Sequence, residues 1–288
     1  MIGLQFNNLI FGSNFEPKIA GYSHERLILP LLIVTRSPLS VDDLPLRKRI
    51  LSLYTHFTAE EHMDQEKSFL RWGGLAGILA GIFFILTIVT LVEFGPSTTA
   101  TTPTQLVMNF PNVRTGLAVG NGFYFLVSVS LVGLALGLYR ALRGTSPGPA
   151  LYGTVLYVLG LGVTFIEDTT QVAFDPISNL YHAPGATAAD QATLALLWQA
   201  TQGMLNEFDV AATLLLSTGL IVLGVAMIRT PAFGKVLGGL SVAFGAAQIL
   251  GISLFSTNSA AYAPFALLAF LIFPALFGSK LYRMSKVA

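Results

Sequence analysis

Six long apolar segments alternate with short polar connections from Trp72 onward in this 288-residue chain. Each has about the 17 to 25 residues that an α-helix needs to cross the hydrocarbon layer of a membrane. The segments are apolar on every side, whereas a helix that covers a soluble core carries a polar stripe at the helical period. The pattern therefore predicts an all-α, polytopic membrane protein, a bundle of six transmembrane helices. The expected spans are residues 72–94, 115–139, 150–174, 206–228, 233–255 and 260–277.

The connections support this division. Residues 97–104 and 175–185 are rich in turn-forming residues and are expected to be irregular. Thr187 with Asp190 three residues later resembles a capping box, and residues 188–204 are helical in composition. The predicted fold therefore includes an outer-surface helix before the fourth span, with Trp198 at headgroup level. The lack of a Gly-Pro break at Leu205 favours a helix that runs continuously into that span.

Basic residues near the segment ends collect on one side of the predicted bundle. Cytoplasmic connections retain Lys and Arg, and nine basic residues fall at alternate junctions and flanks, against Arg114 alone at the other three junctions. The acids beyond Glu66 fall on, or just beneath, the opposite side. The sequence thus predicts a cell-membrane protein whose N- and C-terminal ends are both cytoplasmic. The nine basic residues are Lys67, Arg71, Arg140, Arg143, Arg229, Lys235, Lys280, Arg283 and Lys286.

Residues 1–62 differ from the rest, since they mix polar and apolar positions and carry the basic run Arg47-Lys48-Arg49. Their apolar stretch, Leu27–Val34, is too short to span a bilayer. We expect an irregular N-terminal appendage that touches anionic lipid, or an artefact of start-codon choice, because Met63 opens a natural lead into the first span. The transmembrane domain is expected at residues 63–288.

Composition removes several classes of site and partner. The chain has no cysteine, so it offers no disulfide and no thiolate metal site. His182 is the single histidine beyond the appendage, and no metal or other cofactor is predicted. The basic residues are spread over helix ends rather than gathered on one patch, so nucleic acid is not an expected partner.

Glycines recur at four-residue spacing on several of the predicted helices. Such faces let helices approach closely in a membrane. They are expected either to pair with a second copy or another membrane protein, or to pack helices within one bundle. Their presence on several helices favours packing. They are Gly73, Gly77 and Gly81; Gly116 and Gly120; Gly133 and Gly137; Gly234 and Gly238.

Polar residues inside the spans mark the candidate site, because ionisable groups in a membrane are costly and usually face a cavity or a partner. Glu167 lies about 25 Å into the third span at the helical rise per residue, in its outer third. Polar residues of the second, fourth and fifth spans reach a similar level. The predicted set is Arg114, Asn121, Glu167, Asp168, Gln171, Asn206, Asp209 and Gln248.

We expect these residues to form a shallow polar pocket that opens outward, with Arg114 as the nearby cation. Crowded carboxylates at low dielectric cannot all ionise, so at least one should hold a proton or a cation. The cluster is either a structural clasp, in which Arg114 neutralises Glu167, or a site for a small cationic or amphiphilic ligand. Alternatives are an enzyme acting on an outer-leaflet lipid, with Glu167 or Asp209 as general base, and a non-catalytic membrane subunit. No catalytic residue is assigned.

Several short motifs give the chain from about Trp72 to Ser279 a family resemblance. Pro111-Asn-Val-Arg114-x-Gly116 leads into the second span and Leu138-Tyr139-Arg140-Ala-Leu142 closes it. Gly219-Leu-Ile-Val-Leu-Gly224 is followed by Phe233-Gly234-Lys-Val-Leu-Gly238. With the Glu167-bearing third span, these motifs resemble an uncharacterised prokaryotic six-helix membrane family, the domain-of-unknown-function 4386 group. Thr164 stands where the family often has a basic residue. The resemblance implies the six-helix architecture and no particular activity.

Overall fold

The structure is a computed structural model and describes residues 44–94, 102–255 and 260–287. The chain divides into two compact units, Met1–Thr58 and Ala59–Ala288. Residues 1–43 of the predicted appendage lie outside the described residues, and residues 44–62 are helical rather than irregular. They belong to α2 (Leu44–Phe94), which also carries the first predicted span.

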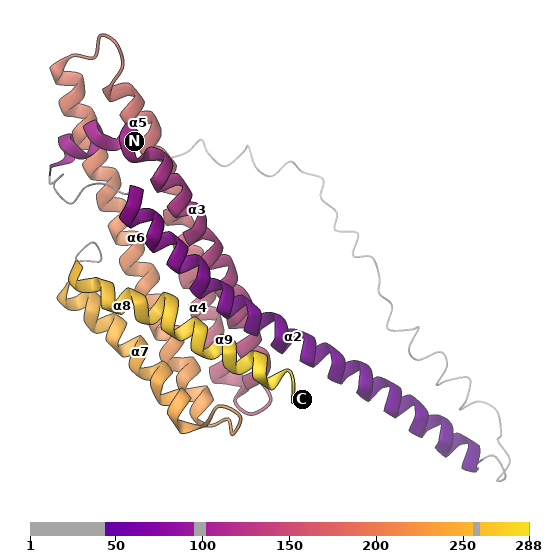
Figure 1. The fold of residues 1–288 in the computed structure, drawn as a ribbon. Coiled ribbons are helices and arrows are strands. Elements are labelled where there is room, and N and C mark those ends of the chain that lie inside the picture. Colours follow the sequence, from indigo (N-terminus) through magenta and orange to yellow (C-terminus); the bar gives the residue numbers. More distant parts are fainter. Residues whose placement is uncertain (1–43, 95–101, 256–259, 288) are drawn as a thin grey trace, which may run out of the picture. The chain divides into compact units, whose positions relative to one another are not determined.

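The described residues of the second unit are helical throughout, apart from short connections (Figure 1). Six of their helical stretches are long and apolar enough to cross a membrane, which confirms the predicted number. After α2, the α-helices are α3 (Pro103–Leu142), α4 (Pro147–Thr170), α5 (Phe174–Tyr181), α6 (Ala188–Ile228), α7 (Gly234–Leu254), α8 (Ala263–Leu267) and α9 (Phe273–Met284). The 3-10 helices η2 (Gln171–Ala173) and η3 (Ala260–Tyr262) and the π-helix η4 (Leu268–Ile272) join some of them.

Helix α3 begins well before the second predicted span. The Thr102 hydroxyl accepts a hydrogen bond from Gln105 N at 3.3 Å, and Gln105 Oε1 accepts one from Thr102 N at 3.2 Å. This capping box, with Pro103 in the first turn, satisfies backbone groups that have no partner inside the helix. Of the loop expected at 97–104, residues 102–104 therefore begin the helix, and residues 97–101 lie outside the described residues.

The connection before the fourth span is also more helical than expected. Residues 174–181, which were expected to form a turn, are helix α5. The predicted capping box at Thr187 is confirmed, since its hydroxyl accepts from Asp190 N at 3.2 Å and its N–H donates to Asp190 Oδ2 at 2.9 Å. From there α6 runs for 41 residues to Ile228 with no proline to stop it. The continuous helix that the sequence favours is therefore confirmed, and residues 188–204 are the first part of α6 rather than a separate surface helix.

Helices α3 and α6 exceed the length that a membrane crossing requires. They have 40 and 41 residues, or about 60 Å each, against about 30 Å of hydrocarbon. Their extra turns pack with α5 through an apolar cluster of their own (Figure 1). The cluster consists of Val107, Phe110, Phe174, Ile177, Tyr181, Trp198 and Leu205. Phe110, Phe174, Trp198 and Leu205 of this cluster also border the candidate site.

The main apolar core joins α2, α3, α4, α6 and α9, and glycines bring some of these helices into backbone contact. A Cβ added at Gly73 of α2 would lie 2.7 Å from the Cα of Gly137 of α3. One added at Gly219 of α6 would lie 2.8 Å from the backbone N of Tyr157 of α4. No side chain fits at such distances, so these faces are occupied within the chain. This favours the packing alternative, while pairing with another copy or protein stays a prediction.

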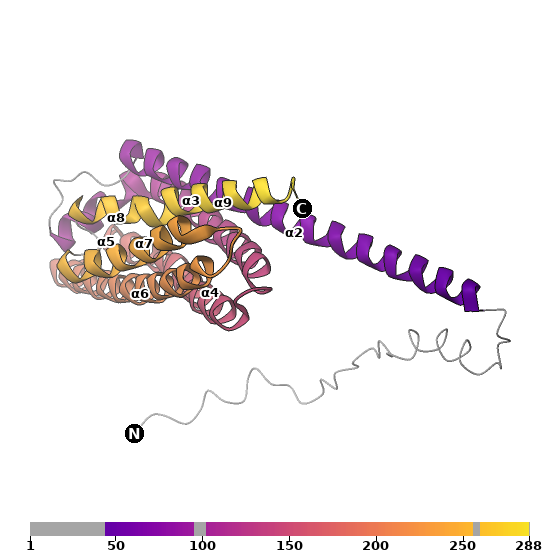
Figure 2. The same ribbon diagram turned by 90° about the horizontal axis from the view of Figure 1, so that it is seen from below.

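The opposite end of the second unit holds the start of its first span and the end of α9. Figure 2 shows α9 beside α2, and a Cβ added at Gly74 would meet the backbone of Tyr282 at 2.6 Å. In the same region Arg140 Nε of α3 lies 3.6 Å from Glu66 Oε1 of α2. This end therefore carries Lys67 and Arg71 at the start of the first predicted span and Arg140 in the last turn of α3.

Candidate functional site

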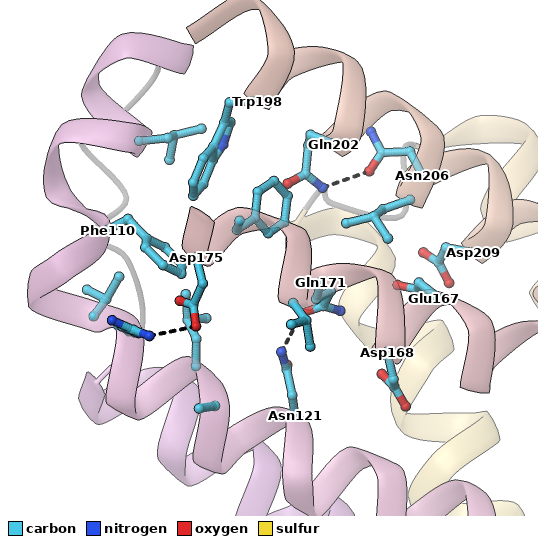
Figure 3. A pocket seen from close by; sticks show the side chains of 18 residues that line it. Phe110, Asn121, Glu167, Asp168, Gln171, Asp175, Trp198, Gln202, Asn206 and Asp209 are labelled. Atoms are coloured by element: carbon cyan, nitrogen blue, oxygen red, sulfur yellow. Dashed lines mark hydrogen bonds and ion pairs between the residues drawn. The ribbon is translucent and has the colours of Figure 1, made fainter. Parts of the chain in front are cut away.

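A cavity of about 440 Å³ lies between α3, the run α4–η2–α5, and α6 (Figure 3). We call it the acidic cavity, because Glu167, Asp168, Asp175 and Asp209 all line it. The structure brings seven of the eight predicted site residues to this cavity. They are Arg114, Asn121, Glu167, Asp168, Gln171, Asn206 and Asp209.

The wall from α4 to α5 follows from helical spacing. Glu167, Gln171 and Asp175 recur at every fourth residue, so they share one face where the chain passes from α4 through η2 into α5. Asp175 was not among the predicted residues because its segment was expected to be a turn. If the helix is continued beyond residue 174, the four-residue spacing from Glu167 through Gln171 predicts Asp175 on the same face.

Arg114 pairs with a different acid from the one expected. Its Nη2 donates to Asp175 Oδ2 at 2.8 Å, and the two side chains are 49% and 33% exposed. Asp175 lies two helical turns beyond Glu167, level with the start of the second predicted span. The predicted neutralisation of Glu167 by Arg114 is therefore wrong. The ion pair lies in the exposed part of the cavity wall, and Figure 3 shows Asp175 away from Glu167.

Amide side chains join the helices between that rim and the carboxyl groups. Asn121 Nδ2 of α3 donates to Gln171 Oε1 of η2, a bridge between two walls of the cavity. On α6, Gln202 Nε2 donates to Asn206 Oδ1 at 3.1 Å. Gln202 lines the cavity too, as the shared face of residues 202, 206 and 209 indicates. The Asn121–Gln171 pair thus joins two walls, whereas the Gln202–Asn206 pair lies within α6.

The remaining carboxyl groups gather on one side of the cavity. Figure 3 shows those of Glu167 and Asp209 pointing toward each other, and Glu167 interacts electrostatically with Asp209 and Asp168. Both carboxylate oxygens of Asp168 are buried and have no hydrogen-bond partner among the described residues. A buried polar group without a partner costs about 1 to 3 kcal/mol, more when it is charged. The buried Asp168 carboxyl group therefore lowers the free energy of unfolding.

An aromatic cluster forms the other side of the cavity and was not predicted. The ring centroid of Trp198 lies 5.1 Å from that of Phe110 and 4.1 Å from that of Phe174. Trp198 is 5% exposed because the α3 and α5 extensions cover it, while its position at headgroup level stays a prediction. Phe110 lies one helical turn before Arg114, and extending α3 to Pro103 would have predicted it on the same face.

Gln248, the eighth predicted residue, does not line the acidic cavity. It is 3% exposed on α7, where it accepts a hydrogen bond from the Tyr262 hydroxyl at 3.1 Å and donates to the Phe265 carbonyl oxygen. Phe265 lies just before the π-helix η4, where the regular backbone hydrogen-bond pattern changes. Gln248 therefore joins α7 to the irregular start of the sixth span.

Comparisons with protein-family models, curated proteins and solved structures find no match for this chain. The resemblance to the domain-of-unknown-function 4386 group stays a prediction. Within the described residues, no group of three or more His, Asp or Glu side chains is arranged to hold a metal ion. The geometry of the acidic cavity therefore carries the functional argument.

Proposed function

We propose that this chain is a cell-membrane protein that spans the bilayer six times and binds a small organic cation in the acidic cavity. The observation that carries the proposal is the two-sided wall of that cavity. Phe110 and Trp198 form one side, with Phe174 against the Trp198 ring, and the carboxyl groups of Glu167 and Asp209 lie on the other (Figure 3). A volume of about 440 Å³ falls within the usual range for small-molecule sites.

The charge of the wall favours a cation. Among the described residues that line the cavity, Arg114 is the one basic side chain against four acids, and Asp175 already pairs with it. The other carboxyl groups thus attract a positive charge, and the attraction is stronger here than in water because the effective dielectric is lower. A ligand charge beside Asp168 would also offset the burial cost of that carboxylate.

The aromatic side favours a ligand with an apolar or quaternary ammonium part. Aromatic faces attract such cations, and an apolar group gains by leaving water. The Arg114–Asp175 pair and the Asn121–Gln171 bridge would then act as the clasp that fixes the walls. Clasp and ligand site are in this proposal two parts of one cluster.

Ligand binding is tested with benzyltrimethylammonium, an aromatic organic cation. The chain has two tryptophans, so the full-length Trp72→Phe variant leaves Trp198 as the reporter inside the cavity. We expect saturable quenching of its fluorescence in detergent or nanodiscs. Glu167→Gln should weaken binding about tenfold, because it removes one charged partner of the cation. The uncharged carbon analogue, neopentylbenzene, should not compete.

Glu207→Gln is the matched control, because Glu207 is exposed on α6 and does not line the cavity. Its affinity should equal that of the parent. Calorimetry on the unmodified chain checks the same affinity without a tryptophan reporter. Equal weakening by both variants, or equal affinity for cation and neutral analogue, would exclude the proposed cation site.

The proposed orientation is tested by labelling single cysteines, since the chain has none of its own. Thr145→Cys lies in the exposed connection after α3, and Pro184→Cys lies in the exposed connection after α5. In intact cells an impermeant maleimide should label Pro184→Cys at once and Thr145→Cys only after permeabilisation. The reverse result would invert the proposed topology.

A further inference from the structure

A second cavity, of about 530 Å³, lies between the start of the first span on α2 and the end of α9. It is lined by Lys67, Ser68, Arg71, Trp72, Leu75 and Ser285, and we call it the basic cavity. The other end of the same span, at Phe94, contacts Gly116 of α3 just beyond Arg114. The basic cavity is therefore separated from the acidic cavity by the length of the span, and none of the proposed cation-binding residues lines it.

Cationic and apolar side chains follow one another along α2 here. Lys67 and Arg71 are four residues apart and share a face, and Leu75 continues the same line. Trp72 beside them is 70% exposed. Further along the helix, Leu79 and Ile82 are 44% and 48% exposed. The cavity thus combines two cations with an exposed indole, and an exposed apolar strip at Leu79 and Ile82 continues along α2 beyond it.

Glu66, the acid next to Lys67 in the chain, lies close to Arg140 of α3. Glu66 Oε1 of α2 lies 3.6 Å from Arg140 Nε, on the α3 side of the helix. In the part of the chain that the structure describes, neither Lys67 nor Arg71 forms an ion pair. Both cations line the basic cavity, and no acidic side chain that the structure describes pairs with either of them. Phosphate is the anion that a nearby Arg and Lys bind best, through several charge-assisted hydrogen bonds.

The wall on α9 is held in place by local contacts. The Ser285 hydroxyl donates to the Tyr282 carbonyl oxygen at 2.8 Å. Lys286 Nζ lies 4.9 Å from the centre of the Tyr282 ring, which holds a third cation close to the cavity. The end of α9 therefore contributes Ser285 to the cavity wall, and the cation of Lys286 follows it in the chain.

From these contacts we propose that the basic cavity binds the phosphate headgroup of an anionic phospholipid, whose acyl chains lie along Trp72, Leu79 and Ile82. A lipid accounts for both halves of the surface: the cations meet the phosphate, and the exposed apolar strip meets the chains. Tryptophan is favoured at the depth where headgroup and chains join. A free phosphate compound would use the same cations and leave the strip without a role.

Brominated lipids test the proposal in reconstituted full-length protein. In the Trp198→Phe variant Trp72 is the one tryptophan, so its quenching reports the lipid at this site. We expect brominated phosphatidylglycerol to quench at lower mole fraction than brominated phosphatidylcholine, a preference of about fivefold to twentyfold for two interfacial cations. The double variant Lys67→Gln/Arg71→Gln should abolish that preference.

Arg143→Gln/Arg229→Gln is the charge-matched control, because both residues are exposed near the same end and lie outside the cavity. It should keep the preference. Equal quenching by the two lipids in the parent, or equal loss in both double variants, would overturn the site. Soluble glycerol phosphate that abolishes the preference at millimolar concentration would overturn the assignment to a lipid. Native mass spectrometry of the unmodified chain, counting retained phosphatidylglycerol, checks the result without a tryptophan substitution.

Discussion

The acidic and basic cavities lie at opposite ends of the bundle and are built in different ways. The acidic cavity is enclosed by α3, α4–η2–α5 and α6 and carries its aromatic residues inside, with Trp198 5% exposed. The basic cavity lies against α2 and α9 and carries Trp72 on the surface, 70% exposed. The first suits a molecule that is taken up whole, and the second suits one that stays largely in the bilayer.

Helix length and helix spacing account for this difference. Helices α3 and α6 exceed the length of a crossing, and their extra turns support side chains that close the acidic cavity from beyond the span. Beside the basic cavity, Gly74 brings α2 and α9 together down to backbone contact, and Trp72 in the cavity wall stays 70% exposed. Between the two cavities, glycines such as Gly73 and Gly219 bring the helices into backbone contact.

The largest effect is expected from filling one of those glycine contacts. A Cβ at Gly219 would lie 2.8 Å from Tyr157 N and 2.9 Å from Gly153 O, so Gly219→Ala must displace α4 or α6. Overpacking of this kind costs about 1 to 3 kcal/mol of unfolding free energy. Thermal unfolding in detergent measures it. Gly203→Ala on the same helix is the control, since nothing lies within 4 Å of its added Cβ. Equal stability of both variants would contradict the close packing.

A smaller effect, of opposite sign, is expected at Asp168. Because both of its oxygens are buried without a hydrogen-bond partner among the described residues, Asp168→Leu should raise the unfolding free energy by about 1 to 2 kcal/mol without ligand. The same change should weaken benzyltrimethylammonium binding. Glu207→Leu, at an exposed position, should alter neither property beyond about 0.5 kcal/mol. A loss of stability in Asp168→Leu would show that the carboxylate is structural.

The smallest effect is expected for the rim ion pair. A double-mutant cycle of Arg114→Gln and Asp175→Asn should give a coupling energy of about 0.2 to 1 kcal/mol, because these side chains are 49% and 33% exposed. The coupling should decrease as salt concentration rises. A coupling above about 2 kcal/mol would make the clasp, rather than ligand binding, the main role of the cluster.

The six spans and most of the candidate site could be predicted from local pattern. The number of long apolar segments predicts the number of membrane-spanning helices. The position of each polar residue along its segment predicts its depth, and residues of equal depth line one cavity. Asp175 and Phe110 were missed because α3 and α5 extend beyond the apolar segments that hydropathy identifies, and Trp198 was missed because its packing against those extensions depends on tertiary structure. Gln248 was assigned wrongly because depth along a helix does not say which neighbour a side chain faces.

The sequence by itself determined the all-helical class, the six spans and the unequal distribution of charge, because each depends on composition and periodicity along a single segment. The tertiary structure alone decided that Arg114 binds Asp175, that glycines join helices within the chain, and that aromatic and carboxyl groups face each other across one cavity. Such contacts depend on the rotation and spacing of whole helices relative to one another. Those are set by packing between residues far apart in the chain, which no local pattern records.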